Sequence, residues 1–252
     1  MASIEVRQRP KGTTYRVVWR TPGGLKKSKT WPTMEKAHRW KSLIEEADGD
    51  STRAAEALAH RSSQAMTVDS VSDHRMERSD GAEQNRFLTR AERRTDIPAI
   101  RAINEAAFPS QEEADLVDNL RADDEAWIDG LSIVTTTDDD APVGHALLSR
   151  CQVGDSPALA LAPCAVLPEY QHQGYGSAAV RAAIEAARSM EERLIVVLGH
   201  PDYYPKFGFV PASRLRVTAP FEVPDDAFMA LQLHPGLEAP SGRVQYASAF
   251  GI

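Results

Sequence analysis

A short glycine-containing loop is the part of the sequence best suited to hold an anionic ligand. Residues 171–177 read Gln-His-Gln-Gly-Tyr-Gly-Ser, and they separate an apolar strand-like segment, 158–166, from an alanine-rich helical pattern. Backbone N–H groups without helical partners converge at a helix start, where the macrodipole is positive. Gly174 and Gly176 allow positive φ or close approach of the backbone to a ligand. The spacing predicts an anion site, with a purely structural turn as the alternative.

Two other phosphate-binding motifs fit this loop poorly. A Walker loop needs Lys-Ser or Lys-Thr after its second glycine, whereas the nearest basic residue here, Arg181, lies well inside the predicted helix. A dinucleotide-binding loop tolerates Ala179 in its third glycine position. However, the next predicted strand, 194–198, runs into Gly199 and not into an acid that would bind a ribose.

A second candidate segment follows that strand, where residues 199–209 read Gly-His-Pro-Asp-Tyr-Tyr-Pro-Lys-Phe-Gly-Phe. Tyr204 is an O–H donor with an ordinary pKa near 10. It can therefore act as a general acid toward a thiolate of somewhat lower pKa. The alternative for Tyr204 is a packing aromatic with its hydroxyl at the surface, which is the role we expect for Tyr203.

The two segments together resemble the signatures of the GNAT superfamily of N-acetyltransferases. Gln171-x-x-Gly174-x-Gly176, after a Val-x-Pro strand end, is similar to the coenzyme A loop of that family. Tyr204-x-x-x-Gly208-Phe209 is similar to its second signature. The resemblance is colinear from about Phe87 to the end of the chain and is strongest to the bacterial YhbS-like subgroup. It implies an α+β fold with a mixed sheet, the GNAT acyl-CoA N-acyltransferase fold.

The resemblance also implies a reaction, in which an acetyl group moves from acetyl-CoA directly to a primary amine of a small molecule or protein. In that family the tyrosine equivalent to Tyr204 lies on a short helix and protonates the departing thiolate. Segment 158–166 would part from its neighbour, so that backbone groups near Ala165 and Val166 pair with the pantetheine arm. The residues implied to bind the pyrophosphate are Gln171, His172, Gln173, Gly174, Tyr175, Gly176 and Ser177.

The base that accepts the proton of the amine stays unassigned. His200 ends a predicted strand beside the implied acetyl site and titrates near neutrality, but it can equally cap the strand or the following turn. An ordered water is the other candidate, and His145 and Glu113 are weaker ones. Cys164 has no His-Asp pair at recognisable spacing. We therefore expect a buried thiol and direct transfer, without an acetylated cysteine.

The first 47 residues differ in charge from the rest of the chain. They hold eleven Lys and Arg against four acids, a net charge of +7, so the remainder carries −14 of the total of −7. Alternating patterns at 3–9, 14–19 and 26–31 predict three strands. Thr33 is a suitable N-cap for a helix whose apolar residues recur at helical spacing through Ile44. The pattern predicts a three-stranded sheet backed by one helix.

This basic segment resembles the small arm-binding domain at the N-terminus of phage and actinobacterial tyrosine integrases. The similar stretches are Thr-Tyr-Arg-Val-Val-Trp-Arg at 14–20, Pro-Gly-Gly at 22–24, Lys-Thr-Trp at 29–31 and Glu-Lys-Ala-His-Arg-Trp at 35–40. The resemblance implies DNA binding by an exposed sheet face. The alternatives are a solvated face or the remnant of a fusion, because no recombinase motif follows. The residues of that face are expected to be Arg7, Arg16, Arg20, Lys27 and Lys29.

These patterns divide the chain into a basic domain at 1–47, a helical extension and linker at 48–85, and an acetyltransferase domain at 86–252. Within the last, we expect helices at 96–108, 112–122 and 176–192. The strands are expected at 87–90, 131–137, 143–153, 158–166, 194–198 and 228–233. A DNA-binding protein that senses acyl-CoA without turnover is the alternative function for this arrangement.

Cysteine content and hydropathy bound the remaining possibilities. Cys151 and Cys164 lie in apolar segments without clustered histidines, so we expect reduced thiols, no disulfide framework and no metal site. No stretch approaches the length of a membrane span, and the start of the chain is polar, which predicts a cytoplasmic protein without membrane partners.

Overall fold

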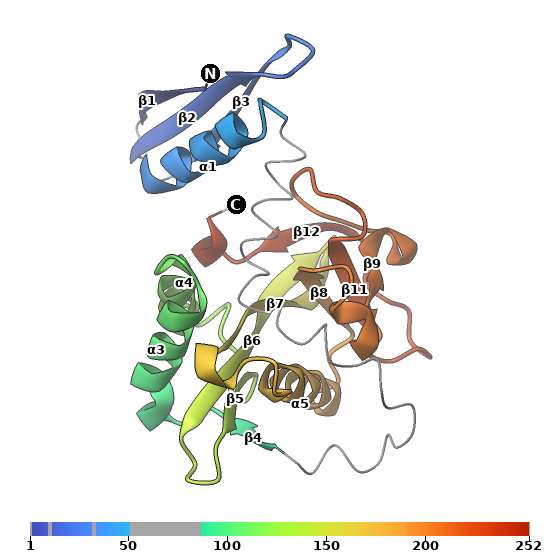
Figure 1. Cartoon of the computed structure of the whole chain (residues 1–252). Helices are drawn as coiled ribbons and strands as arrows, with labels where there is room; N and C mark the ends of the chain where they lie inside the picture. The colour runs from blue at the N-terminus through green and yellow to red at the C-terminus, as the bar shows by residue number, and fades with distance from the viewer. Residues whose placement is uncertain (1, 10–11, 32–33, 51–86, 252) are drawn as a thin grey trace. The chain divides into compact units, whose positions relative to one another are not determined.

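The computed structural model describes residues 2–9, 12–31, 34–50 and 87–251, which fall into two compact units (Figure 1). Thr33 and residues 51–85 of the predicted helical extension and linker lie outside the described residues. None of the described helices is long and apolar enough to cross a membrane.

The first unit is a three-stranded antiparallel sheet with one helix. Strands β1 (Ser3–Arg9), β2 (Gly12–Arg20) and β3 (Lys26–Trp31) lie in that order, and α1 (Met34–Glu46) covers one face of the sheet (Figure 1). The side chains that alternate toward α1 form the core. Trp19 and Trp40 meet edge to face there, with ring centroids 6.1 Å apart. The structure confirms the predicted sheet and helix.

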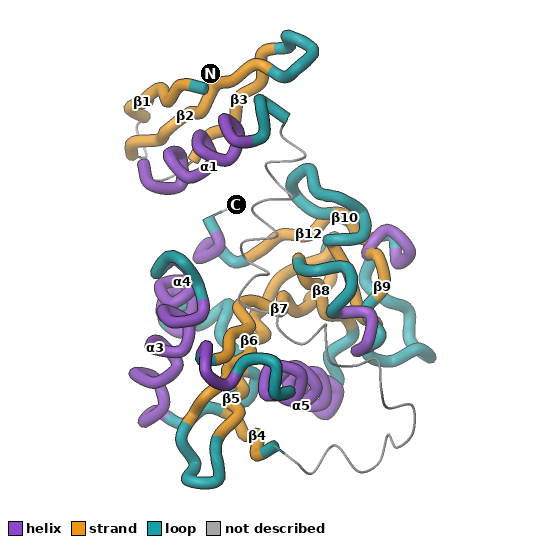
Figure 2. The backbone as a smooth tube through the Cα atoms, in the orientation of Figure 1, coloured by secondary structure: helices purple, strands orange, loops and turns teal. Residues whose placement is uncertain are grey.

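The second unit is built on a mixed sheet whose main path runs β10-β12-β6-β7-β8-β11-β9, with β5 and then β4 added beside β6 (Figure 2). Strands β7 and β8 pair in parallel, as do β10 and β12, and the other pairs are antiparallel. The strands are β4 (Leu88–Ala91), β5 (Ser132–Thr136), β6 (Pro142–Val153), β7 (Ser156–Val166), β8 (Leu194–Leu198), β9 (Val210–Pro211), β10 (Val217–Thr218), β11 (Phe228–Gln232) and β12 (Gly242–Tyr246).

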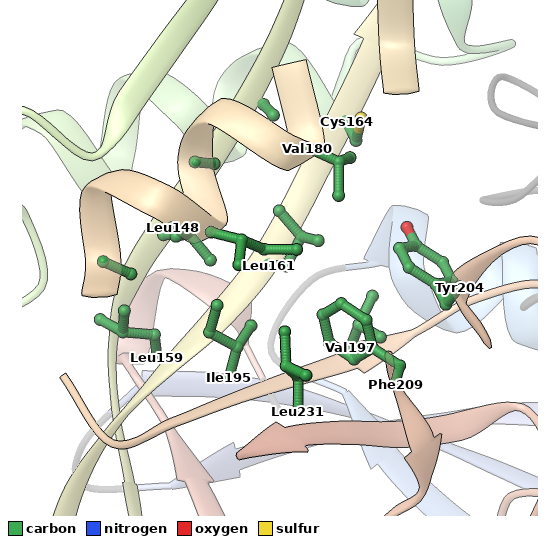
Figure 3. Close-up of a cluster of buried hydrophobic side chains, with 14 of the residues drawn as sticks. Leu148, Leu159, Leu161, Cys164, Val180, Ile195, Val197, Tyr204, Phe209 and Leu231 are labelled. Atoms are coloured by element: carbon green, nitrogen blue, oxygen red, sulfur yellow. The ribbon is translucent and has the colours of Figure 1, made fainter. Parts of the chain in front are cut away.

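Three helices cover the two faces of this sheet. Side chains alternate along each strand, so neighbours enter different cores. Val134 and Leu147 pack with α3 (Ile97–Ala107) and α4 (Glu112–Arg121). Ile133 and Leu148 instead pack with α5 (Tyr175–Ser189) in the main core, part of which Figure 3 shows. The sheet is thus buried on both faces, which explains the continuous apolar runs in β6 and β7.

Most expected elements of this unit are present, with ends that differ by a few residues. The sequence did not predict the short strands β9, β10 and β12. The run of aspartates at 138–140, between β5 and β6, is partly paired. Asp140 accepts hydrogen bonds from Arg90, at 2.8 Å, and from Arg93, so this hairpin is tied to the segment around β4.

Candidate cofactor-binding and catalytic site

The loop before α5 has the geometry of an anion site. Gly174 is the N-cap of α5 with φ of +96°, and no side chain caps this helix end. The first helical bond joins the Ala178 N–H to the Gly174 carbonyl at 3.0 Å. A Cβ at position 174 would lie 2.8 Å from the Phe87 ring, so a larger residue fits neither the backbone conformation nor the space. The turn presents the helix start, with its positive dipole end, to a ligand.

Side chains of the loop hold the loop itself. The Gln171 amide donates to the Val166 carbonyl at 3.0 Å, and the Gln173 amide donates to the Glu169 carbonyl at 2.7 Å. The Tyr175 ring meets the Phe87 ring, with centroids 4.9 Å apart. These interactions fix the loop, so its backbone N–H groups, rather than its side chains, are the donors available to an anion.

Three other residues of the predicted site differ in environment. His172 is exposed and adopts φ of +60°, a conformation that histidine tolerates better than branched residues do. Gly176 is buried, and a Cβ there would lie 3.2 Å from the Val166 side chain. Ser177 is buried, with its hydroxyl turned toward the segment that follows β8.

Strands β7 and β8 part near the middle of β7. Their pairing covers only Leu159 with Ile195 and Ala160 with Val196, although β7 continues to Val166. A β-bulge interrupts the β6–β7 ladder beyond Leu161, because the partners shift by one residue there. The edge of β7 that faces β8 therefore carries backbone groups outside the β7–β8 ladder, as the sequence resemblance implies.

The end of β7 is anchored from its other side. Ala165 pairs with His145 of β6, and its side chain packs with Ile103 and Phe108 beside α3. Val166 pairs with Gly144, where a Cβ would lie 2.3 Å from the Thr135 hydroxyl. Because β6 fixes this segment, its free edge is held in place without help from β8.

Tyr204 lies inside the main core. It begins a 3-10 turn, Tyr204–Phe207, in line with the short helix that the resemblance implies, and only 1% of it is exposed. Its ring contacts Phe209, with centroids 5.5 Å apart, and a Cβ at Gly199 would lie 2.2 Å from the ring. In Figure 3 its hydroxyl points to the side of the cluster where Cys164 lies. Burial, with smaller contributions from Cys164 and Tyr203, raises the pKa of Tyr204 far above its ordinary value, so the hydroxyl keeps its proton at neutral pH.

The neighbouring Tyr203 points elsewhere. It is 4% exposed, and its hydroxyl lies 3.4 Å from the Ser177 hydroxyl in the first turn of α5. Its ring meets the Tyr204 ring at an interplanar angle of 87°. The Tyr203 ring packs, as expected, but its hydroxyl is buried and not at the surface, and it links the segment after β8 to α5. Sequence reasoning missed this link because nothing in the local pattern shows that the two segments meet.

The candidate bases have other contacts. His200 Nδ1 accepts a hydrogen bond from the Asp202 N–H at 3.2 Å, which is the turn-capping alternative considered from sequence. Glu113 accepts a hydrogen bond from the Ser110 hydroxyl at 3.3 Å. Cys164 is a buried, reduced cysteine.

His145 belongs to a buried polar network that the sequence did not reveal. The Asn104 amide lies 3.3 Å from its Nδ1, and the Ser132 hydroxyl lies 2.9 Å from its Nε2. Ser132 donates in turn to Glu92, which also accepts two hydrogen bonds from Arg121, each 3.0 Å long. Complete burial lowers the pKa of His145 to about 3. The network joins α3, β5, β6 and α4 behind the end of β7.

The basic residues predicted to share one face of the first unit divide between its two sides. Arg16 and Arg20 alternate along β2 with the core residues Val17 and Trp19, so they lie on the face opposite α1. Arg7 lies on that same open face, because it is out of phase with the core-packed residues of β1.

Lys27 and Lys29 lie on the other side. They pair in the β2–β3 register with Trp19 and Val17, whose side chains face α1. The Lys29 ammonium lies 4.9 Å from the centroid of the Trp40 ring, in accord with this placement. The expectation that all five cations share the open face is therefore wrong for these two, because strand alternation sends them toward the helix.

Comparisons with known proteins agree on one family for the second unit. The model of the Acetyltransferase (GNAT) family matches residues 97–209. The uncharacterized N-acetyltransferase YjhQ of Escherichia coli K12 is 39% identical over 138 residues, which are 53% of this chain and 75% of YjhQ.

Two solved structures extend the similarity to the fold. The GNAT family N-acetyltransferase YhbS from Escherichia coli, in complex with CoA, superposes with a TM-score of 0.61 at 28% identity, covering 70% of this chain and 97% of that one. A GNAT family acetyltransferase from Brucella melitensis, in complex with acetyl-CoA, gives 0.53 at 30% identity and covers 65% of this chain and 97% of that one. The predicted GNAT fold is confirmed.

The neutral, buried His145 makes stability depend on pH. Its folded-state pKa of about 3 lies below the ordinary 6.5, so below pH 6.5 the unfolded chain binds more protons than the folded one. The free energy of unfolding must therefore fall as the pH falls from 6.5 toward 3. We expect this residue to contribute a loss of about 2 kcal/mol between about pH 7 and about pH 5, measured by urea denaturation.

His145→Gln should remove that part of the pH dependence, whatever its effect on stability at neutral pH. His172→Asn is the matched control, because His172 is exposed and asparagine tolerates its positive φ. An unchanged pH dependence in His145→Gln would contradict the assignment of a strongly lowered pKa to this imidazole.

Proposed function

Because this chain belongs to the GNAT acetyltransferase family, we propose that its second unit transfers the acetyl group of acetyl-CoA directly to a primary amine of a small molecule or protein. The observation that carries the proposal is the combination of an uncapped helix start after Gly174, a free edge on β7 and the buried hydroxyl of Tyr204. The helix start binds a phosphate group, the edge of β7 binds an amide-containing arm, and Tyr204 holds a proton.

The residues present fit acetyl-CoA as the donor. Gly174 takes the left-handed conformation of the turn and leaves room for the Phe87 ring, so the helix start has no capping side chain and its N–H groups can meet a pyrophosphate. The part of β7 beyond its ladder with β8, near Ala165 and Val166, suits the amides of a pantetheine arm, since an extended chain can add to a strand edge. Acetyl-CoA supplies the activated thioester, and the chain supplies its binding and orientation.

Tyr204 is the proposed general acid. When the amine nitrogen bonds to the acetyl carbon, the carbon–sulfur bond breaks and the sulfur takes up a proton. A tyrosine whose pKa is raised by burial stays protonated at neutral pH, so its proton is present when the thiolate forms. The phenolate left behind is disfavoured in an apolar core, so reprotonation follows readily.

The proton of the amine needs a different acceptor. The His200 ring contacts the backbone of Asp202, which supports a structural role for it in the turn. His145 is neutral and enclosed by its network. We therefore favour an ordered water, or an amine that arrives partly neutral, as the route for this proton.

Replacing Tyr204 by Phe tests the acid. We expect kcat to fall about 100-fold or more while the dissociation constant of CoA stays within about threefold, because general acids contribute at this scale. The measurement is CoA release against an amine panel, combined with calorimetric titration of CoA. Tyr246→Phe is the control, because that hydroxyl is also buried and its pKa is also raised.

Full turnover by Tyr204→Phe would sink the acid assignment. CoA binding by the wild-type chain without turnover of any amine would instead favour the alternative function, a protein that senses acyl-CoA.

Replacing Gly174 by Ala tests the loop. A left-handed conformation costs alanine about 1–2 kcal/mol, and the new methyl group would meet the Phe87 ring, so we expect CoA affinity to fall about tenfold. Gly236→Ala is the matched control, because nothing lies within 4 Å of a Cβ at that position. Equal affinities for the two variants would contradict the proposed role of this turn.

The first unit supports a second function, DNA binding, which would localise the enzyme. Its open sheet face carries Arg7, Arg16 and Arg20, and the register adds Lys26 opposite Arg20. Glu5 lies among these cations and forms an ion pair with Arg7 at 3.2 Å. A sheet face with several cations, opposite the face that α1 covers, fits the phosphates and groove of duplex DNA.

Fluorescence anisotropy with labelled duplex DNA tests this surface. Arg16→Gln and Arg20→Gln should each weaken binding about tenfold and lower the salt slope by about 1, because each removes a phosphate contact. Lys27→Gln removes the same charge from the α1 side of the sheet and should have little effect. Equal losses of DNA affinity in the three variants would show that binding depends on the net charge of the unit and not on its open sheet face.

A further inference from the structure

The pyrophosphate loop is poor in positive charge. Residues 167–180 contain Glu169 and no lysine or arginine, and the chain beyond residue 47 carries a net charge of −14. The start of α5 supplies only about half a positive charge through its dipole. CoA carries a pyrophosphate and a separate phosphate monoester on its ribose. Cations that hold this ligand must therefore come from outside the loop sequence.

Two cations meet on one aromatic ring beside α5. The Arg181 guanidinium lies 5.4 Å from the centroid of the Phe207 ring, and the Lys206 ammonium lies 5.3 Å from the same centroid. The ammonium is also 4.1 Å from the centroid of the Tyr203 ring. Both cationic residues are exposed. The aromatic rings hold the two long side chains in place while their charged groups face solvent.

These cations are one helical turn from the loop. Ser177 and Arg181 are four residues apart and share one face of α5, separated by about 6 Å along the axis. The Tyr203 hydroxyl contacts Ser177, while Phe207, from the same 3-10 segment as Tyr204, contacts Arg181. The segment after β8 thus follows this face of α5 and brings Lys206 to it.

The placement separates two kinds of phosphate site. The first turn of α5 offers backbone N–H groups, which suit the pyrophosphate. The pair at Arg181 and Lys206 offers a planar donor and a point charge, which together suit a doubly charged phosphate monoester.

We propose that Arg181 and Lys206 form a subsite for the ribose 3′-phosphate of CoA. This subsite rests on the proposed function, because it requires the pyrophosphate to lie at the start of α5. It makes the second unit selective for CoA over dephospho-CoA, which lacks this phosphate alone. The electrostatic contribution is exposed to solvent, so the selectivity weakens as salt rises.

Calorimetric titration of the full chain with CoA and with dephospho-CoA tests the subsite. The wild type should bind CoA about tenfold more tightly than dephospho-CoA at low salt. Arg181→Gln and Lys206→Gln should each reduce CoA affinity about fivefold or more, with dephospho-CoA affinity unchanged within about twofold. Arg188→Gln is the matched control. It removes the same charge from the same helix, where Arg188 pairs with Glu185 at 3.6 Å, and it should preserve the wild-type selectivity.

The outcomes separate the subsite from the function on which it rests. Equal wild-type affinity for both ligands, or equal losses for both ligands in the variants, would overturn the subsite and leave the proposed function standing. Loss of selectivity in Arg188→Gln as well would assign the effect to net charge and overturn it too. Failure of the wild type to bind either ligand would overturn the proposed function and the subsite together.

Discussion

The parting of β7 from β8 is the constraint on which the rest of the second unit depends. Buried backbone groups need hydrogen-bond partners, so two parallel strands that separate inside a sheet must have their free edges satisfied by something else. Here β6 pairs up to Val166 with the edge of β7 that faces away from β8, and β11 pairs with β8 along its full length. The sheet therefore stays intact while one inner edge remains available to an extended ligand.

The two faces of the sheet support this edge by different means. On the α5 side, apolar packing around Leu148 and Leu159 buries Tyr204. This burial raises the pKa of its hydroxyl, which therefore stays protonated. On the α3 side, the end of β7 rests on Ala165 and a polar network centred on His145. A hydrogen-bonded network specifies one arrangement of the helices, while apolar packing supplies most of the free energy. A reactive side chain needs both kinds of support, because its position and its environment each affect its reactivity.

Features with a local cause were predictable from the sequence, and features set by pairing were not. Gly174 predicts a turn, because only glycine takes that φ without cost. The alanine-rich run after it predicts α5. Strand register places Lys27 on the α1 side, and a count of charged residues does not reveal register. The His145 network and the Tyr203–Ser177 contact join residues that are 13 to 41 positions apart. The short strand β12 is defined by its pairing with β6 and β10, which its own sequence does not reveal.

Net charge and local charge act at different ranges in this chain. An acidic body repels an anionic cofactor at long range, and salt at physiological strength screens that repulsion beyond about 8 Å. Inside that distance, the helix start after Gly174 and nearby cations decide the sign of the field. Backbone N–H donors do not titrate, so their attraction persists across pH, whereas exposed cations add charge that salt can weaken. An acidic protein can therefore bind a polyanion where backbone donors and nearby cations lie together around one helix start.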